Sequence, residues 1–275
     1  MGGGSVEAFV ALAIALSVVL GWMFQPRRPR VVAEPPSRWR ERLTLLVPQS
    51  AFVAPAQRGS YEQHCEAFLR EKQFVGCNGL EVTDDMRIAV AGLACLLLLR
   101  PYNRVFPAVH HVLLYPDRFF VHHELPDHDG LVHDEPLEHL GESWHGDRVI
   151  LSWRDVEAAL HGDETNVVVH EFAHQLDDET PEMEGVPALQ DYAHWAEIME
   201  REFKRLRRHR RPPVIDAYGA ESPGEFFAVV TEAFFQRGAA LRHHHVELYR
   251  LLRDYYGLDP AAVELWRHPL NGAHA

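Results

Sequence analysis

The chain has 275 residues, of which 24% are charged, and a formal net charge of −13. A domain this acidic repels nucleic acid, so the sequence argues against a nucleic-acid partner. Its three cysteines, Cys65, Cys77 and Cys95, are scattered and odd in number. They form neither a disulfide framework nor a cysteine-based zinc site, and this usage is typical of an intracellular protein.

The N-terminal segment is apolar without interruption over residues 8–24, roughly the minimum length of a membrane-spanning helix. Arg27, Arg28 and Arg30 follow it, whereas no basic residue precedes it and no small-x-small cleavage site follows it. This pattern predicts an uncleaved single-pass anchor in the inner (cytoplasmic) membrane, with everything after Arg27 facing the cytoplasm. The alternatives are a cleaved signal peptide, or a buried core helix in a soluble cytoplasmic protein.

Three segments are therefore expected. Residues 1–30 would be the membrane anchor and its basic flank, and residues 31–38 a short linker. Residues 39–275 are enough for one large domain or two closely packed lobes.

The expected secondary structure is mixed. Residues 60–100 have a mostly helical pattern, and residues 86–99 are apolar enough to be well buried. Strands are predicted at residues 111–114 and 118–122, around a Tyr-Pro-Asp turn, and at residues 148–153. The chain then turns helical towards its C-terminus. The sum predicts an α+β fold with a small sheet and a helical second half.

The most informative motif is His170-Glu171-Phe172-Ala173-His174, which has the form HExxH. On a helix, two histidines four residues apart lie on one face, so that both can bind one zinc ion. Glu171 would lie beside a water on that zinc and act as the general base. Upstream, Asn166 can cap the helix. Downstream, Asp177 lies on the same face and could accept the second N–H of a ligand imidazole. The alternative is a core helix with two hydrogen-bonded histidines.

Basic residues then gather near the end of an expected amphipathic helix, at Arg201, Lys204, Arg205, Arg207, Arg208, Arg210 and Arg211. A solvated helix end that complements the helix dipole is the preferred interpretation. Lipid headgroups are the alternative ligand.

A catalytic zinc ion needs a third protein ligand. Ser222 and Pro223 have the pattern of a helix start, which places Glu225 in the first turn. Glu225 is either that ligand or the partner of Ser222 in a capping box, and the residues alone leave both open. Glu232, two turns further along the same face, is a rival ligand or a partner of a ligand. Glu221 is a weaker rival, because it precedes the helix.

Histidine also occurs in three runs, His110-His111, His122-His123 and His243-His244-His245. Neighbours on a strand point to opposite faces, and neighbours on a helix diverge by about 100°, so these runs make poor chelators. Surface or core roles are expected for them.

Several separated motifs resemble the Mlc titration factor A family of zinc metallopeptidases, which is zincin-like and related to the catalytic domain of anthrax lethal factor. The match includes the stretch from His170 to Asp177 and residues 215–218 and 225–229. Residues 112–116, 141–144 and 149–153 fit the same family. The resemblance runs from about Trp39 to about Gly257.

The resemblance implies one zinc ion per chain, with His170, His174 and Glu225 as its ligands and Glu171 as general base. Tyr218 would point into the site and donate its hydroxyl to the developing oxyanion. A core or rim position is the alternative for Tyr218. Asp177 and Glu232 occupy motif positions as candidate partners of the ligands.

Zincin-like peptidases place an edge strand beside the cleft, where an extended peptide can add to it. Residues 148–153 are the candidate for this strand, and a plain strand of the sheet is the alternative.

Two classes of function follow. The favoured one is a zinc-dependent peptidase that acts on a peptide substrate, with aminopeptidase-like activity implied by the resemblance. The alternative is a regulatory binding protein that sequesters a transcriptional repressor of glucose uptake genes, in which the zinc site is structural or regulatory. Family members of the best-known kind are soluble, so the apolar segment at residues 8–24 is a departure from them.

Overall fold

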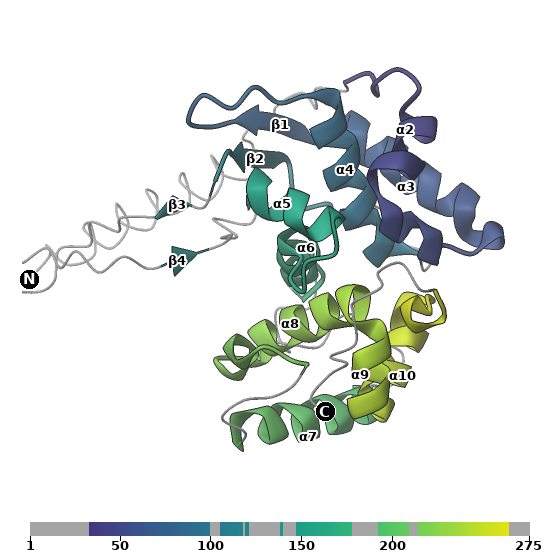
Figure 1. Ribbon diagram of the computed structural model, residues 1–275, viewed down its shortest axis with the longest axis vertical. Coiled ribbons are helices and arrows are strands. Elements are labelled where there is room, and N and C mark those ends of the chain that lie inside the picture. Colours follow the sequence, from purple (N-terminus) through teal and green to yellow (C-terminus); the bar gives the residue numbers. More distant parts are fainter. Residues whose placement is uncertain are drawn as a thin grey trace, which may run out of the picture. The chain divides into compact units, whose positions relative to one another are not determined.

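The structure is a computed structural model (Figure 1), and it describes residues 33–99, 105–117, 119–120, 138–139, 147–177, 192–208 and 214–263. These residues belong to one compact unit that begins at Ala33. The unit is mostly helical with a small parallel sheet, which confirms the predicted α+β class.

The sheet has three parallel strands in the order β1 (Gln73–Gly76), β2 (His111–Tyr115) and β5 (Arg148–Ser152). The predicted strands near residues 111 and 148 are thus present, and β5 forms one edge of this described sheet. β1 was not predicted, because four residues between two helices are too short for a clear alternation. Two short strands pair antiparallel outside this sheet, β3 (Phe119–Phe120) and β4 (Glu138–His139).

The helices before the sheet's last strand form the N-terminal part of the core. Thr83 caps α4 (Asp84–Cys95) by accepting a hydrogen bond from the Met86 amide, and every residue from Ile88 to Cys95 is buried. Leu96 to Leu99 are buried as well, so the predicted burial of residues 86–99 is confirmed for all but the first two. The other elements of this half are α2 (Trp39–Leu46), α3 (Arg58–Glu71) and the 3-10 turns η1 (Pro48–Phe52), η2 (Pro55–Gln57) and η3 (Leu96–Leu98).

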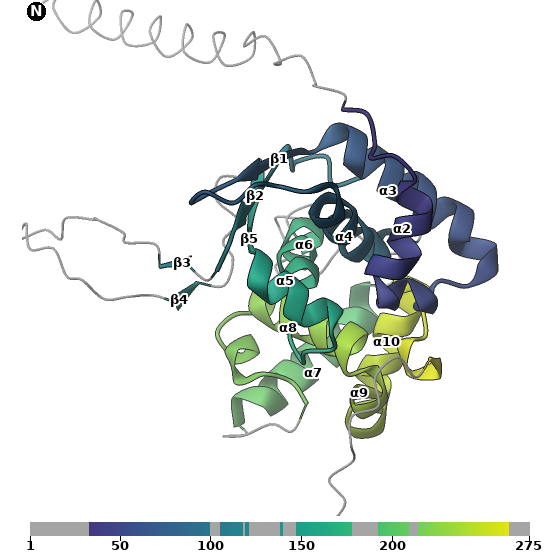
Figure 2. The same ribbon diagram turned by 45° about the horizontal axis from the view of Figure 1, so that its top comes forward.

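The HExxH motif lies on α6 (Val167–Asp177), which the short helix α5 (Trp153–Leu160) precedes. Ser152 caps α5, so the strand ends one residue earlier than predicted. α6 packs against β5 and α4 and also against α8 (Pro223–Gln236), so it lies between the sheet-bearing half and the C-terminal helices (Figure 2).

Only helices are described after α6, as predicted. They are α7 (Tyr192–Arg208), η4 (Ala217–Ala220), α8, α9 (Gly238–His244), α10 (Val246–Tyr256) and η5 (Pro260–Ala262). Aromatic side chains join them: Trp195 of α7 packs at 6.0 Å from Phe227 of α8 and at 5.1 Å from Tyr255 of α10, measured between ring centroids. This packing holds α8 in place beside α6.

Five of the seven basic residues predicted near the end of an amphipathic helix lie within α7. Arg201 pairs with Glu247, Lys204 with Glu200 and Arg205 with Glu202. These contacts fit a solvated helix end with local ion pairs. Arg210 and Arg211 lie outside the described residues.

The predicted single-pass membrane protein needs correction. Across the described ranges no helix is both long enough and apolar enough to cross a membrane. The longest of them, α7, has 17 residues and many charges, whereas a spanning helix needs about 20 mostly apolar residues. The apolar segment at residues 8–24, on which the prediction rested, lies outside the described residues.

The buried side chain of Lys72 holds the segment that leads into β2. Lys72 is 2% exposed, and its ammonium donates to the carbonyl oxygens of Val105, Phe106 and Val109, at 2.7, 2.7 and 2.8 Å. Lys72→Met leaves buried carbonyls without this donor, so we expect the free energy of unfolding to fall by about 3 kcal/mol.

Chemical denaturation of the full chain measures this loss. Lys204→Met is the matched control, because Lys204 is exposed and pairs with Glu200 one helical turn away. The control should lose no more than about 0.5 kcal/mol. Equal losses in both variants would contradict a structural role for the buried ammonium.

Candidate metal centre

The start of α6 aims its two histidines. Asn166 caps the helix, because its side-chain oxygen accepts a hydrogen bond from the Val169 amide at 3.1 Å. The apolar residues Val168, Val169, Phe172 and Ala173 are fully buried, and they fix the rotation of the helix. His170 and His174, one turn apart, then face α8.

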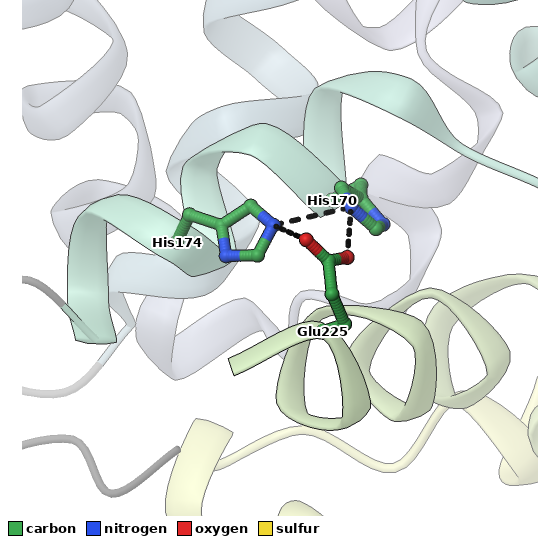
Figure 3. Close-up of side chains that lie close together, drawn as sticks. All are labelled: His170, His174 and Glu225. Carbon is green, nitrogen blue, oxygen red and sulfur yellow. Dashed lines mark hydrogen bonds and ion pairs between the residues drawn. The ribbon is translucent and has the colours of Figure 1, made fainter. Parts of the chain in front are cut away.

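The start of α8 brings a carboxylate to the same place. Ser222 caps the helix by accepting from the Glu225 amide at 3.1 Å, and Pro223 is its first residue, as predicted. The Glu225 side chain does not turn back to the cap. Its carboxylate lies between the two imidazoles (Figure 3). Capping and the contact with the histidines therefore use different atoms of Glu225.

Three distances define the site. Nε2 of His170 lies 3.2 Å from Nε2 of His174 and 3.2 Å from Oε2 of Glu225. Nε2 of His174 lies 3.5 Å from Oε1 of Glu225. Among the residues that the structure describes, these three form the one group of His, Cys, Asp and Glu side chains close enough to share a metal ion. The described members of the histidine runs form no such group.

These side chains fit a tetrahedral metal ion. Bonds of about 2.0–2.1 Å from such an ion place neighbouring ligand atoms about 3.3 Å apart, close to the 3.2 Å between the two nitrogens and the 3.2 and 3.5 Å from each nitrogen to a carboxylate oxygen. In addition, Oε2 of Glu225 is buried and accepts no hydrogen bond. A buried carboxylate oxygen without a donor is costly, and a cation between the three side chains would satisfy it.

Glu232 orients the first histidine from behind. Its Oε1 accepts from Nδ1 of His170 at 2.6 Å, and its Oε2 accepts from the backbone amide of Asn166 at 2.7 Å. A neutral His170 then carries its proton on Nδ1 and presents a lone pair at Nε2, which is the tautomer that a metal ligand needs. Glu232 thus lies on the Nδ1 side of His170, away from the three converging atoms.

The electrostatics favour a positive charge at this place. Burial works to lower the pKa of His170, but the neighbouring carboxylates of Glu225 and Glu232 outweigh it, and the pKa is raised well above its usual value. Burial works to raise the pKa of Glu225, but the two histidines outweigh it and lower that pKa to about 2. The carboxylates thus hold a proton on an imidazole, where a metal cation would supply the same charge.

Glu171 is enclosed beside this cluster, with 3% of its surface exposed. Burial raises the pKa of its carboxyl group, and the charges of Glu225 and Glu232 add to the rise, while His170 and His174 oppose it. An elevated pKa suits a group that must both accept and release a proton near neutral pH.

Tyr218 lies at the rim. It belongs to the turn η4, whose start Asp216 caps by accepting from the Tyr218 amide at 2.8 Å. The ring centroid of Tyr218 is 6.2 Å from that of His170, and the side chain is 43% exposed. Burial and the neighbouring carboxylates of Glu225, Glu221 and Glu171 raise the pKa of its hydroxyl, so it stays a hydrogen-bond donor.

Two further candidates from the sequence, Asp177 and Glu221, do not belong to the group of three converging side chains. Asp177 ends α6 with a buried side chain, and its pairing with an imidazole stays a prediction. Glu221 is exposed and lies at the end of η4, before α8 begins, so it is not part of the helix that carries Glu225.

The sequence patterns did not point to Gln236 or Gln49. The side chain of Asn166 donates to Oε1 of Gln236, and Nε2 of Gln49 donates to the same oxygen. Gln236 could have been found from the sequence, because it is a polar residue one turn after Glu232 on a mostly apolar helix.

Comparison with known proteins agrees with this geometry. Residues 23–257 match the family model of the glucose-regulated metallo-peptidase M90. The chain is 39% identical to an uncharacterized protein of Synechocystis sp., over 90% of this chain and 97% of the relative.

Two relatives carry a more informative name. A Mlc titration factor A of Klebsiella pneumoniae is 31% identical, over 78% of this chain and 84% of its own length. The Mlc titration factor A of Pectobacterium atrosepticum is 28% identical, over 92% of this chain and 97% of its own length. These matches confirm the resemblance inferred from the motifs, and the chain belongs to the glucose-regulated metallo-peptidase M90 family.

Proposed function

We propose that this protein is a zinc-dependent metallopeptidase in which His170, His174 and Glu225 hold the metal ion. The observation that carries the proposal is the convergence of three side chains: the two Nε2 atoms lie 3.2 Å apart, and each lies 3.2 or 3.5 Å from one of the two carboxylate oxygens of Glu225. Two imidazoles and one carboxylate are a known ligand set of catalytic zinc, and three protein ligands leave a fourth position open. The domain responsible would span residues 39–275.

A bound zinc ion would lower the pKa of a water molecule towards neutrality and polarise the carbonyl group of a peptide. Glu171 would take the proton from the attacking water and pass it to the leaving amine. Its burial and raised pKa support this double role.

Tyr218 would stabilise the oxyanion that develops on the carbonyl oxygen. Its raised pKa keeps the hydroxyl protonated, and its exposed position at the rim allows contact with a substrate. The edge position of β5 among the described strands supports binding of an extended peptide alongside it. Glu232, and Asp177 if it reaches His174, would orient the imidazoles.

The test uses the full-length chain. We expect elemental analysis to find close to one zinc ion per chain, and we expect the protein to cleave members of a mixed peptide library. A chelator should abolish cleavage, and added zinc should restore it. Peptides with free and with acetylated N-termini distinguish an aminopeptidase from an endopeptidase. A protein that is refolded with zinc, dialysed and found without metal would overturn the proposal.

A second candidate function is the sequestration of a transcriptional repressor. The observation that favours it is the name of several relatives, Mlc titration factor A. In this case the metal centre would stabilise or regulate the binding surface, and Glu171 would not be needed.

A further inference from the structure

A polar stripe runs along the side of α8 that faces α6. Glu225, Glu232 and Gln236 are separated by seven and four residues, so they lie on one helical face. Nearly all other residues of α8 are buried and apolar. Glu225 meets the two imidazoles and Glu232 orients His170, which leaves Gln236 as the member of the stripe without an assigned role.

Both the nitrogen and the oxygen of the Gln236 side-chain amide form hydrogen bonds. It is 5% exposed, and its Nε2 donates to the carbonyl oxygens of Ala159 and Asp163, at 3.1 and 2.7 Å. Its Oε1 accepts from Nδ2 of Asn166 at 3.4 Å and from Nε2 of Gln49 at 3.2 Å. Gln236 thereby ties the connection between α5 and α6 to the helix that carries Glu225 and Glu232.

Asn166 is the next link, and it is fully buried. Its side-chain oxygen caps α6, its backbone amide donates to Oε2 of Glu232, and its carbonyl oxygen accepts from the His170 amide at 2.9 Å. With the 2.6 Å bond between Glu232 and Nδ1 of His170, these contacts close a ring around the first histidine. A shift of Asn166 therefore moves both the backbone and the ring partner of His170.

We propose that Gln236 is a positioning residue of the metal centre, acting through Asn166 and Glu232 on the orientation of the His170 imidazole. The inference rests on the proposed role of His170 as a metal ligand. The four hydrogen bonds of Gln236 go neither to the three converging side chains nor to Glu171, so it acts through this hydrogen-bonded path. Groups that hold a ligand in place contribute to metal affinity because a ligand already in position loses less freedom on binding.

Gln236→Met tests the path, because methionine has a similar volume and makes none of the four hydrogen bonds. We expect zinc affinity, measured by competition with a chromogenic chelator, to fall by about tenfold, the low end of the range for outer partners of a metal site. The visible absorption bands of the cobalt-substituted protein should shift as well, because they report ligand geometry.

Gln49→Met is the matched control. Gln49 is also a buried glutamine, and it shares the acceptor Ala159 with Gln236, but it bonds to neither Asn166 nor Glu232. Both variants should lose folding stability, whereas zinc affinity and the cobalt spectrum should change only in Gln236→Met.

Asn166→Ser cuts the same path from its other side and serves if Gln236→Met does not fold. Serine keeps the cap of α6, since its hydroxyl can accept from the Val169 amide, but it cannot reach Gln236. The same loss of affinity and the same direction of spectral shift are expected.

Zinc affinity and cobalt spectra that match the wild type in Gln236→Met, or that change equally in Gln49→Met, would overturn the inference while the proposed function stands. A wild-type chain that binds no zinc would instead overturn the proposed function.

Discussion

Replacing Glu171 with glutamine is expected to lower the rate of peptide hydrolysis by about 10²- to 10⁴-fold, while the chain keeps its metal ion. Glutamine has the shape of glutamate but cannot accept a proton. The three converging side chains are unchanged in this variant, so metal affinity should stay within about threefold of the wild type. Steady-state kinetics and elemental analysis on the same preparation measure both effects.

The same variant separates the two candidate functions. A metal centre that only stabilises a binding surface needs its three ligands but no adjacent base. Glu171→Gln should therefore keep any binding to a repressor while it loses hydrolysis. Cleavage at the wild-type rate by a variant that contains one zinc ion per chain would contradict the proposed mechanism.

Replacing Glu225 with alanine is expected to remove the metal ion and all hydrolysis. The variant loses the carboxylate that, among the described residues, lies within 3.5 Å of both Nε2 atoms, and two imidazoles alone bind zinc far more weakly than three ligands do. After dialysis we expect less than about one tenth of a zinc ion per chain. Elemental analysis and circular dichroism together measure metal content and folding.

Ser222→Ala is the control that distinguishes a ligand from a helix cap. Ser222 accepts from the Glu225 amide, so its loss should cost about 1 kcal/mol of folding stability and leave the zinc in place. If Glu225→Ala keeps its zinc, the carboxylate is not a ligand. Glu232, which lies against Nδ1 of His170, would then be the next side chain to replace.

Several features of the fold were predictable because they depend on neighbours along the chain. The cap at Asn166, the start of α8 at Ser222 and Pro223, and the burial within α4 follow from patterns that span one or two helical turns. β1 was missed because a four-residue strand is recognised only through its pairing with β2. The prediction of a single-pass membrane protein was wrong, because no helix among the described residues could cross a membrane. It rested on the apolar run at residues 8–24 and on the charges and cleavage signals around that run.

The sequence by itself determined that His170 and His174 share one face of a helix and that Glu171 lies beside that face, because the helical period alone decides this. It also determined that Glu225 and Glu232 line one side of another helix.

Only the tertiary structure decided which of these carboxylates meets the imidazoles. Glu225 lies opposite both Nε2 atoms, Glu232 lies behind His170, and Gln236 reaches Asn166. The register between α6 and α8 sets these partners, and packing of apolar residues 50 or more positions apart in the chain sets that register. No local pattern contains that information, so the sequence by itself could not decide whether Glu225 or Glu232 faces both imidazoles.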